Sequence, residues 1–203
     1  MRRMKKRTLF VGGGALLGVI LLAVGWQALA RPYAYQGSLI EPALPAAEIE
    51  SLDQHGNLFR LSEQRGKVVL LAFGYTNCPD VCPTTLAQLK QIKNQLGEQA
   101  NDAQFVFITV DPERDTPQRL QLYLEQFDPS FIGISGNRSD LEPIWQNYFV
   151  YQAKRDTGSA AGYIVDHTSR IYAIDKAGNL RLTYPYESGQ DAILADVRHL
   201  IQE

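Results

Sequence analysis

The apolar positions of the chain predict alternating strands and helices from residue 47 onward. Val68 to Phe73 is an unbroken apolar run of mainly β-branched and aliphatic residues, typical of a central strand buried on both faces. Phe105 to Val110 is a second run of this kind and predicts a neighbouring strand. Between them, apolar residues recur at helical spacing from Pro83 to Leu96, and Gly97 ends the pattern. These segments predict a β-α-β core.

The pattern on both sides extends this core to a whole domain. Upstream, two short runs around a turn-like cluster predict a β-hairpin over Ala47 to Leu61. After the second core strand, Thr116 is a candidate cap for a helix that begins at Pro117. Further on we expect a strand at Phe131 to Ile134, a helix at Leu141 to Phe149, strands at Val150 to Ala153 and Gly162 to Val165 around a polar loop, a hairpin of Ser169 to Ile174 with Asn179 to Tyr184, and a helix at Gln190 to Ile201. This order is that of a thioredoxin-like three-layer α/β/α domain spanning residues 47–203.

The first 46 residues have a different composition. Residues 8–30 are uncharged, and at about 1.5 Å per residue they reach roughly 35 Å, enough to cross a bilayer as a helix. Residues 1–7 carry five positive charges and should stay in the cytoplasm, which sends the domain outward. Cleavage after Ala30 is the alternative, but the apolar run exceeds that of a signal peptide, so we expect a retained transmembrane anchor. The proline-containing residues 31–46 are expected to form a tether.

The charge balance limits the class of partner. The whole chain carries −2 and its basic N-terminus +5, which leaves −7 for residues 31–203. Nucleic acid is therefore excluded as the expected partner, and a basic docking surface on another protein is favoured.

The two cysteines of the chain are the main candidate for chemistry. Cys78 and Cys82 follow the first core strand, and Pro83 suits the first position of a helix, so we expect Cys82 at the helix N-cap and Cys78 in the loop before it. A helix N-terminus favours thiolate over thiol. Such a pair can exchange electrons as a dithiol and disulfide, or bind a soft metal such as Cu(I). An inert disulfide here would close too short a loop to stabilise much, and zinc would lack a fourth protein ligand.

His167 is the candidate third ligand. It precedes a strand of the terminal hairpin, in a loop that faces the cysteine loop in a thioredoxin-like layout. Thioredoxin-like oxidoreductases usually carry a cis-proline there, whereas this chain has no proline between Pro143 and Pro185. An imidazole beside two thiolates makes a donor set that also holds Cu(II). A lone loop histidine often has no such role, so the residues alone leave its ligation open.

Three segments together resemble the signature segments of the Sco/SenC family, which consists of membrane-tethered, thioredoxin-like copper chaperones that help assemble cytochrome c oxidase. They are Gly74-Tyr-Thr-Asn-Cys-Pro-Asp-Val-Cys-Pro83, Asp111-Pro-Glu-Arg-Asp-Thr-Pro117 and Asp166-His-Thr168. The resemblance covers about residues 40–203 and implies that Cys78, Cys82 and His167 ligate one copper ion, Cu(I) or Cu(II). Asp80 and Asp111 also match family positions, with local roles expected, and Tyr75 and Tyr163 are expected to pack beside the site.

The resemblance thus implies a copper metallochaperone in a bacterial inner membrane, with its domain in the periplasm. Only seven residues precede the apolar segment, where a mitochondrial protein would need a targeting presequence. The implied recipient is the binuclear copper centre of cytochrome c oxidase subunit II, and another periplasmic copper carrier or a thiol reductant is a further candidate partner. The alternatives are a thiol–disulfide oxidoreductase with Cys78 and Cys82 as redox pair, or a redox or copper sensor. A peroxiredoxin-type peroxidase is disfavoured because the upstream proline of its motif is missing.

Overall fold

The computed structural model describes residues 32–159 and 162–203. The chain divides into two compact units, Met1–Ala34 and Tyr35–Glu203, and the fold lies in the second. The expected cytoplasmic segment and transmembrane anchor, residues 1–30, fall outside the described residues. Within the described ranges, no helix is long and apolar enough to cross a membrane.

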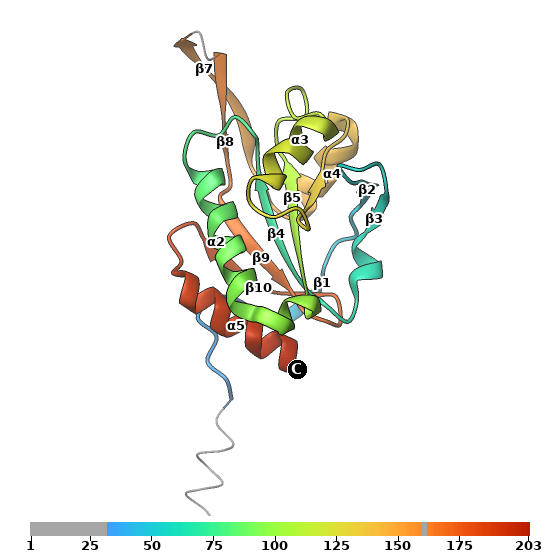
Figure 1. Cartoon of the computed structure of the whole chain (residues 1–203), viewed down its shortest axis with the longest axis vertical. Helices are drawn as coiled ribbons and strands as arrows, with labels where there is room; N and C mark the ends of the chain where they lie inside the picture. Colours follow the sequence, from blue (N-terminus) through green and yellow to red (C-terminus); the bar gives the residue numbers. More distant parts are fainter. Residues whose placement is uncertain (1–31, 160–161) are drawn as a thin grey trace, which may run out of the picture. The chain divides into compact units, whose positions relative to one another are not determined.

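The elements follow the predicted order (Figure 1). They are β1 (Ser38–Pro45), β2 (Glu50–Leu52), β3 (Leu58–Arg60), η1 (Leu61–Gln64), β4 (Val68–Gly74), α2 (Val81–Leu96), η2 (Gly97–Asp102), β5 (Ala103–Thr109), α3 (Pro117–Glu125), β6 (Ile132–Ile134), α4 (Arg138–Asn147), β7 (Gln152–Ser159), β8 (Gly162–His167), β9 (Arg170–Ile174), β10 (Asn179–Pro185) and α5 (Gln190–Gln202).

A mixed six-stranded sheet forms the middle layer, in the order β1-β10-β9-β4-β5-β6. Strands β4, β5 and β6 run parallel, and β9, β10 and β1 add to them antiparallel. All seven residues of β4 are buried, as its unbroken apolar run predicts. Because β4 and β5 are parallel, their carboxyl ends meet at one edge of the sheet, where the site lies.

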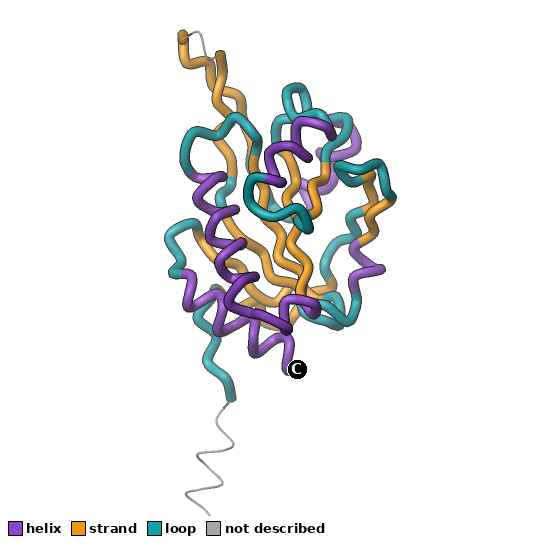
Figure 2. Tube along the Cα trace, viewed as in Figure 1, coloured by secondary structure: helices purple, strands orange, loops and turns teal. Residues whose placement is uncertain are grey.

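Helices cover both faces of the sheet (Figure 2). Helix α2 packs against α5. Cys82 of α2 lines a small cavity together with Phe107 of β5, and Tyr123 of α3 packs against the same Phe107 ring. Tyr148, at the end of α4, packs against Phe73 on the opposite face. The predicted thioredoxin-like α/β arrangement is therefore confirmed, as is the hairpin of β2 and β3 before it.

Several bounds differ from the sequence-based expectation: α4 spans Arg138–Asn147 rather than Leu141 to Phe149, and His167, expected in a loop, is the last residue of β8. Three further segments also differ. Ser38–Pro45, expected within the tether, is an edge strand paired with β10, because an edge position tolerates its prolines. The polar loop expected after Ala153 is mostly strand, since β7 and β8 form a long hairpin that stands away from the sheet and needs no buried face (Figure 1). Helix α2 begins at Val81 with Asp80 as N-cap, so Cys82 lies inside the first turn rather than at the cap.

Candidate functional site

The two cysteines lie at the carboxyl end of β4 and differ in depth. Cys78 is partly exposed in the loop, whereas Cys82 is buried in the first turn of α2 and only 2% exposed. The backbone N–H of Cys82 donates to the Cys78 sulfur at 3.3 Å. A free N–H at the start of a helix thus serves the outer cysteine. Both thiols are free rather than joined in a disulfide.

This arrangement separates the acidities of the two thiols. A hydrogen bond from Cys82 lowers the pKa of Cys78 to about 5; burial opposes this shift, while the backbone N–H groups of Asp80 and Cys82 assist it. The same hydrogen bond, together with burial, raises the pKa of Cys82 far above its ordinary value. The hydrogen bond between the two sulfur atoms and the deeper burial of Cys82 therefore both favour the thiolate at Cys78 over the thiolate at Cys82.

His167 reaches the pair from the end of β8. Its Nε2 lies 3.8 Å from the Cys82 sulfur, although 85 residues separate the two in the chain. Its Nδ1 lies 3.0 Å from the carbonyl oxygen of Val165. A carbonyl only accepts, so in the neutral ring Nδ1 carries the proton and Nε2 presents its lone pair to the sulfur. The expectation that this segment faces the cysteine loop is confirmed.

Tyr75 fixes the orientation of that histidine. Its buried ring meets the His167 ring edge-on, with centroids 5.7 Å apart. Its hydroxyl accepts a hydrogen bond from the Val165 N–H at 3.2 Å, and Val165 in turn holds Nδ1 of His167. Tyr75 therefore positions the imidazole by direct packing and through the backbone of β8.

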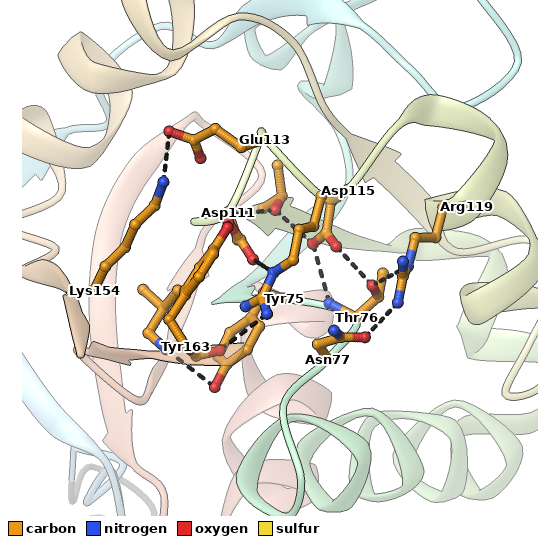
Figure 3. A network of polar contacts seen from close by, with 12 residues as sticks. Tyr75, Thr76, Asn77, Asp111, Glu113, Asp115, Arg119, Lys154 and Tyr163 are labelled. Carbon is orange, nitrogen blue, oxygen red and sulfur yellow. Dashed lines mark hydrogen bonds and ion pairs between the residues drawn. The ribbon is translucent and has the colours of Figure 1, made fainter. Parts of the chain in front are cut away.

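The second signature segment supports the cysteine loop. Asp115, which is fully buried, accepts hydrogen bonds from the Thr76 N–H at 3.0 Å, the Thr76 hydroxyl at 2.6 Å and the Thr109 hydroxyl at 2.7 Å (Figure 3). Arg119 of α3 donates to the Thr76 hydroxyl at 2.8 Å and also to Asn77. Hydrogen bonds from α3 and from the segment before it therefore fix Thr76 and Asn77, which form the first half of the cysteine loop.

The same segment also supports β8. Asp111, fully buried, pairs with Arg114 and accepts from the Tyr163 hydroxyl at 2.7 Å. The Arg114 guanidinium lies over the Tyr163 ring, 3.7 Å from its centroid, and donates to the Tyr163 carbonyl at 2.9 Å. Farther out, Glu113 pairs with Lys154 of β7 (Figure 3). One short loop therefore braces both the cysteine side and the histidine side of the site.

Gly74 makes room for the buried thiol. A Cβ at this position would lie 2.7 Å from the Cys82 sulfur and 2.8 Å from the Phe107 ring, closer than side chains tolerate. The last residue of β4 must therefore be glycine for the Cys82 sulfur to pack this closely against the strand.

The structure brings together the three residues predicted to carry the chemistry: Cys78, Cys82 and His167. Across the described residues, no three His, Cys, Asp or Glu side chains form a finished metal cage, so these donors are neighbours rather than a closed coordination shell. Two thiol sulfurs and one imidazole nitrogen are nevertheless a soft donor set that fits copper. Asp80 lies exposed at the N-cap of α2 without a side-chain capping bond.

Sequence reasoning missed the residues that support this group. Asp115, Thr76, Arg119 and Gly74 are common residue types whose roles depend on contacts across the fold. Asp111 was expected to have a local role, and its carboxylate does pair with Arg114 of its own loop, but it also accepts a hydrogen bond from the distant Tyr163 hydroxyl. The signal available in the sequence was the Asp-Pro-Glu-Arg-Asp-Thr-Pro segment itself, which concentrates charged residues after a buried strand.

Comparison with known proteins identifies the family. Residues 41–202 match the family described as SCO1/SenC. A SCO2-like protein of Rickettsia prowazekii is 36% identical over 172 residues, which cover 84% of this chain and 82% of that protein. ScoI of Bradyrhizobium japonicum, solved with copper bound, is 34% identical with a TM-score of 0.70, covering 76% of this chain and 98% of its own. Apo Sco1 of Thermus thermophilus, also 34% identical, has a TM-score of 0.74 and covers 83% and 98%. This chain belongs to the SCO1/SenC family.

Proposed function

We propose that this protein is a membrane-anchored copper metallochaperone that binds copper at Cys78, Cys82 and His167 and delivers it to the binuclear centre of cytochrome c oxidase subunit II. The observation that carries the proposal is the approach of His167 Nε2 to within 3.8 Å of the Cys82 sulfur, with Nδ1 turned to a carbonyl. A thiol–disulfide exchanger needs no such imidazole. The copper in the solved ScoI of Bradyrhizobium japonicum supports the same cargo here.

The unequal thiols suggest an order of binding. Cys78 is the more accessible cysteine and already a thiolate at neutral pH, so it meets copper first. Cys82 then binds and gives up its proton, and the lone pair of His167 Nε2 completes the set. Release follows the reverse course, with the recipient's thiols replacing these ligands one at a time.

The proposed location follows from the N-terminal sequence. Residues 8–30 anchor the chain in a bacterial inner membrane, the basic residues 1–7 stay in the cytoplasm, and the domain lies in the periplasm. The partners proposed with it are subunit II of the oxidase, a periplasmic copper carrier and a thiol reductant.

A second candidate function is the reduction of the recipient's copper-binding cysteines. It is favoured by one observation, the thiolate at Cys78 beside the protonated Cys82. The Cys78 thiolate would attack a recipient disulfide and form a mixed disulfide, which releases one recipient thiolate. Cys82 would lose its proton and attack Cys78, which releases the second thiolate and leaves Cys78 and Cys82 joined. The two electrons come from this dithiol.

Copper titration of the reduced full-length protein in detergent separates the two functions. We expect one tightly bound copper ion, no tight binding in Cys78→Ser, and affinity weakened at least about tenfold in His167→Ala, the scale on which metal-site residues act. If His167→Ala bound copper like the wild type while the cysteines still reduced a disulfide substrate, the metallochaperone proposal would give way to the reductase.

A further inference from the structure

The loop after α4 carries a phenylalanine where a helix end favours glycine. The Val150 N–H donates to the Trp145 carbonyl at 2.7 Å, and the Phe149 N–H donates to the Gln146 carbonyl at 3.1 Å. This pair of bonds closes many helices around one left-handed residue, which is usually glycine. Here that residue is Phe149, with φ of 55° and a side chain that is 89% exposed. Glycine would adopt this conformation without strain, so the stability of the fold does not account for a phenyl ring at this position.

The exposed aromatic side chains of the described chain gather beside one proposed copper ligand. Among residues 32–159 and 162–203, the exposed phenylalanine and tyrosine side chains are Phe149, Tyr151 and Tyr186, at 89%, 64% and 36%. The Tyr151 N–H donates to the Thr168 hydroxyl at 3.0 Å, and the Tyr151 carbonyl accepts from the Thr168 N–H at 3.1 Å. The Tyr186 N–H donates to the Ser169 carbonyl at 3.1 Å. The aromatic residues therefore flank the two residues that follow His167.

The same residues border the metal site itself. Gln152, which follows Tyr151, pairs with His167 in the register of β7 and β8. Tyr186 lines the same small cavity as Cys82. A protein that takes copper from this site must bring its own ligands up to His167, which is partly exposed. Its surface must then cover the segments on either side of His167, and these segments carry the exposed rings.

The chemistry of this surface indicates the kind of partner. Residues 146–153 contain no charged residue, although residues 31–203 carry −7 overall. The centres of protein interfaces are enriched in aromatic residues and depleted of charged ones. A charged partner surface would lose its water here without gaining a counter-charge. The surface therefore fits a partner whose copper ligands are surrounded by uncharged, apolar side chains.

We propose that Phe149, Tyr151 and Tyr186 form the docking surface for the protein that exchanges copper with this site, and that this partner presents an uncharged, apolar surface around its own metal ligands. The inference rests on the proposed function and adds the surface that the recipient contacts. It also accounts for Phe149, because a strained and exposed residue can be kept for its contribution to a complex rather than to the fold.

Copper transfer to two acceptors tests the inference. Full-length protein loaded with Cu(I) in detergent is mixed either with the reduced, copper-free soluble domain of oxidase subunit II or with a small Cu(I) chelator, which needs no docking surface. In the double variant Phe149→Gly, Tyr151→Ser we expect the rate of transfer to the subunit II domain to fall at least about tenfold, as when aromatic anchors of an interface are truncated. Copper affinity and transfer to the chelator should keep their wild-type values. Phe149→Gly alone should also slow transfer to the subunit II domain while leaving the fold at least as stable, which separates docking from misfolding.

Leu44→Ser is the matched control. The Leu44 side chain is 52% exposed on β1. Through the register of β1, β10, β9 and β4 it lies level with Val69, at the amino end of β4, whereas the site lies at the carboxyl end. This variant should transfer copper to both acceptors at the wild-type rates.

The possible results separate this inference from the proposed function. If the wild type delivers copper to the subunit II domain and the double variant does so equally fast, the docking surface is refuted and the proposed function stands. The same equal rates with a changed molecular mass in light scattering would assign the rings to contact between copies of this chain. Slower transfer to both acceptors would show that the substitutions disturb the metal site, which also overturns the inference. If the wild type yields copper to the chelator but not to the subunit II domain, the proposed delivery fails and this inference fails with it.

Discussion

Asp115 accepts two hydrogen bonds from Thr76, one from the backbone N–H at 3.0 Å and one from the hydroxyl at 2.6 Å. A buried carboxylate that receives only donors binds its partners more strongly than a neutral acceptor would. Thr76 lies two residues before Cys78, so this contact fixes where the cysteine loop leaves the sheet. The geometry of the thiols therefore depends on a residue that touches neither of them.

Asp115→Asn should loosen the loop without changing its shape much. The amide would turn an NH₂ group toward existing donors, and we expect a loss of about 2 kcal/mol in unfolding free energy, typical of a buried hydrogen bond to a charged group. Copper affinity should fall as well. Urea denaturation and chelator competition measure the two effects. Asp140→Asn, an exposed carboxylate on α4, is the control and should change neither. Equal unfolding free energies and equal copper affinities in the two variants would contradict the role given to Asp115.

Gly74→Ala should displace the Cys82 sulfur. The new methyl group would lie 2.7 Å from this sulfur, so either the helix start or the strand must shift. We expect a stability loss of about 1–3 kcal/mol, the usual range for overpacking, together with weaker copper binding. Gly136→Ala is the matched control, because a Cβ there meets nothing closer than 3.9 Å. Copper binding of wild-type strength in Gly74→Ala would show that the close packing is not needed.

Alkylation of Cys78 should follow an unusual pH profile. Because its pKa is lowered to about 5, its thiolate fraction rises through pH 5 and is nearly complete at pH 7. Its reaction rate with iodoacetamide, followed by peptide mass spectrometry, should therefore level off by pH 7, while Cys82 stays unreactive. A rate that still climbs between pH 7 and 9 would show an ordinary thiol.

The same shift predicts how the stability of the reduced protein depends on pH. Between the folded pKa of about 5 and the ordinary thiol value of 9.0, Cys78 is deprotonated in the folded state and protonated in the unfolded state. The unfolded state binds more protons, so the contribution of Cys78 to the unfolding free energy increases with pH across this window and is lost toward pH 5. Comparing urea denaturation of the wild type and Cys78→Ser at pH 5.5 and 7.5 isolates this contribution. A stability difference that does not grow with pH would contradict it.

Phe149→Gly should stabilise the protein. Phe149 follows α4 with φ of 55°, a left-handed conformation that costs a non-glycine residue about 1 kcal/mol, and its side chain is 89% exposed. Part of this gain is offset by the freer unfolded chain, so we expect a net increase of about 0.5 kcal/mol. Leu122→Gly removes a similarly exposed side chain from within α3 and should instead destabilise by about 1 kcal/mol. Denaturant titration measures the change in unfolding free energy of each variant. A loss of stability in Phe149→Gly would mean that the phenyl ring makes a stabilising contact.

The sequence predicted best where burial dominates. The apolar runs at Val68 and Phe105 gave β4 and β5, and the helical stripe after Pro83 gave α2, because each element buries its side chains in one core. Thr116 caps α3 as expected, accepting from the Arg119 N–H. The proximity of His167 to the cysteines also followed, since the thioredoxin-like order carries it there.

What the sequence did not predict depends on contacts between distant segments. Strand β1 owes its existence to pairing with β10, and its prolines and exposed side chains give no strand pattern. Strand β7 is polar because it pairs with β8 away from the core. Asp115 is a buried carboxylate in a segment that looks like a solvated loop, and only the fold brings Thr76 and Thr109 to it.

Because 85 residues separate Cys82 from His167, the metal site forms only when the chain folds. The cysteines are close neighbours in sequence, but the histidine reaches them only after β8 has docked on Tyr75 and the Asp111 loop. A chain that has not finished folding therefore offers two thiols but not the full set of donors. Copper should then accumulate on folded molecules and stabilise them against unfolding. Molecules that carry copper are therefore those whose folding is finished.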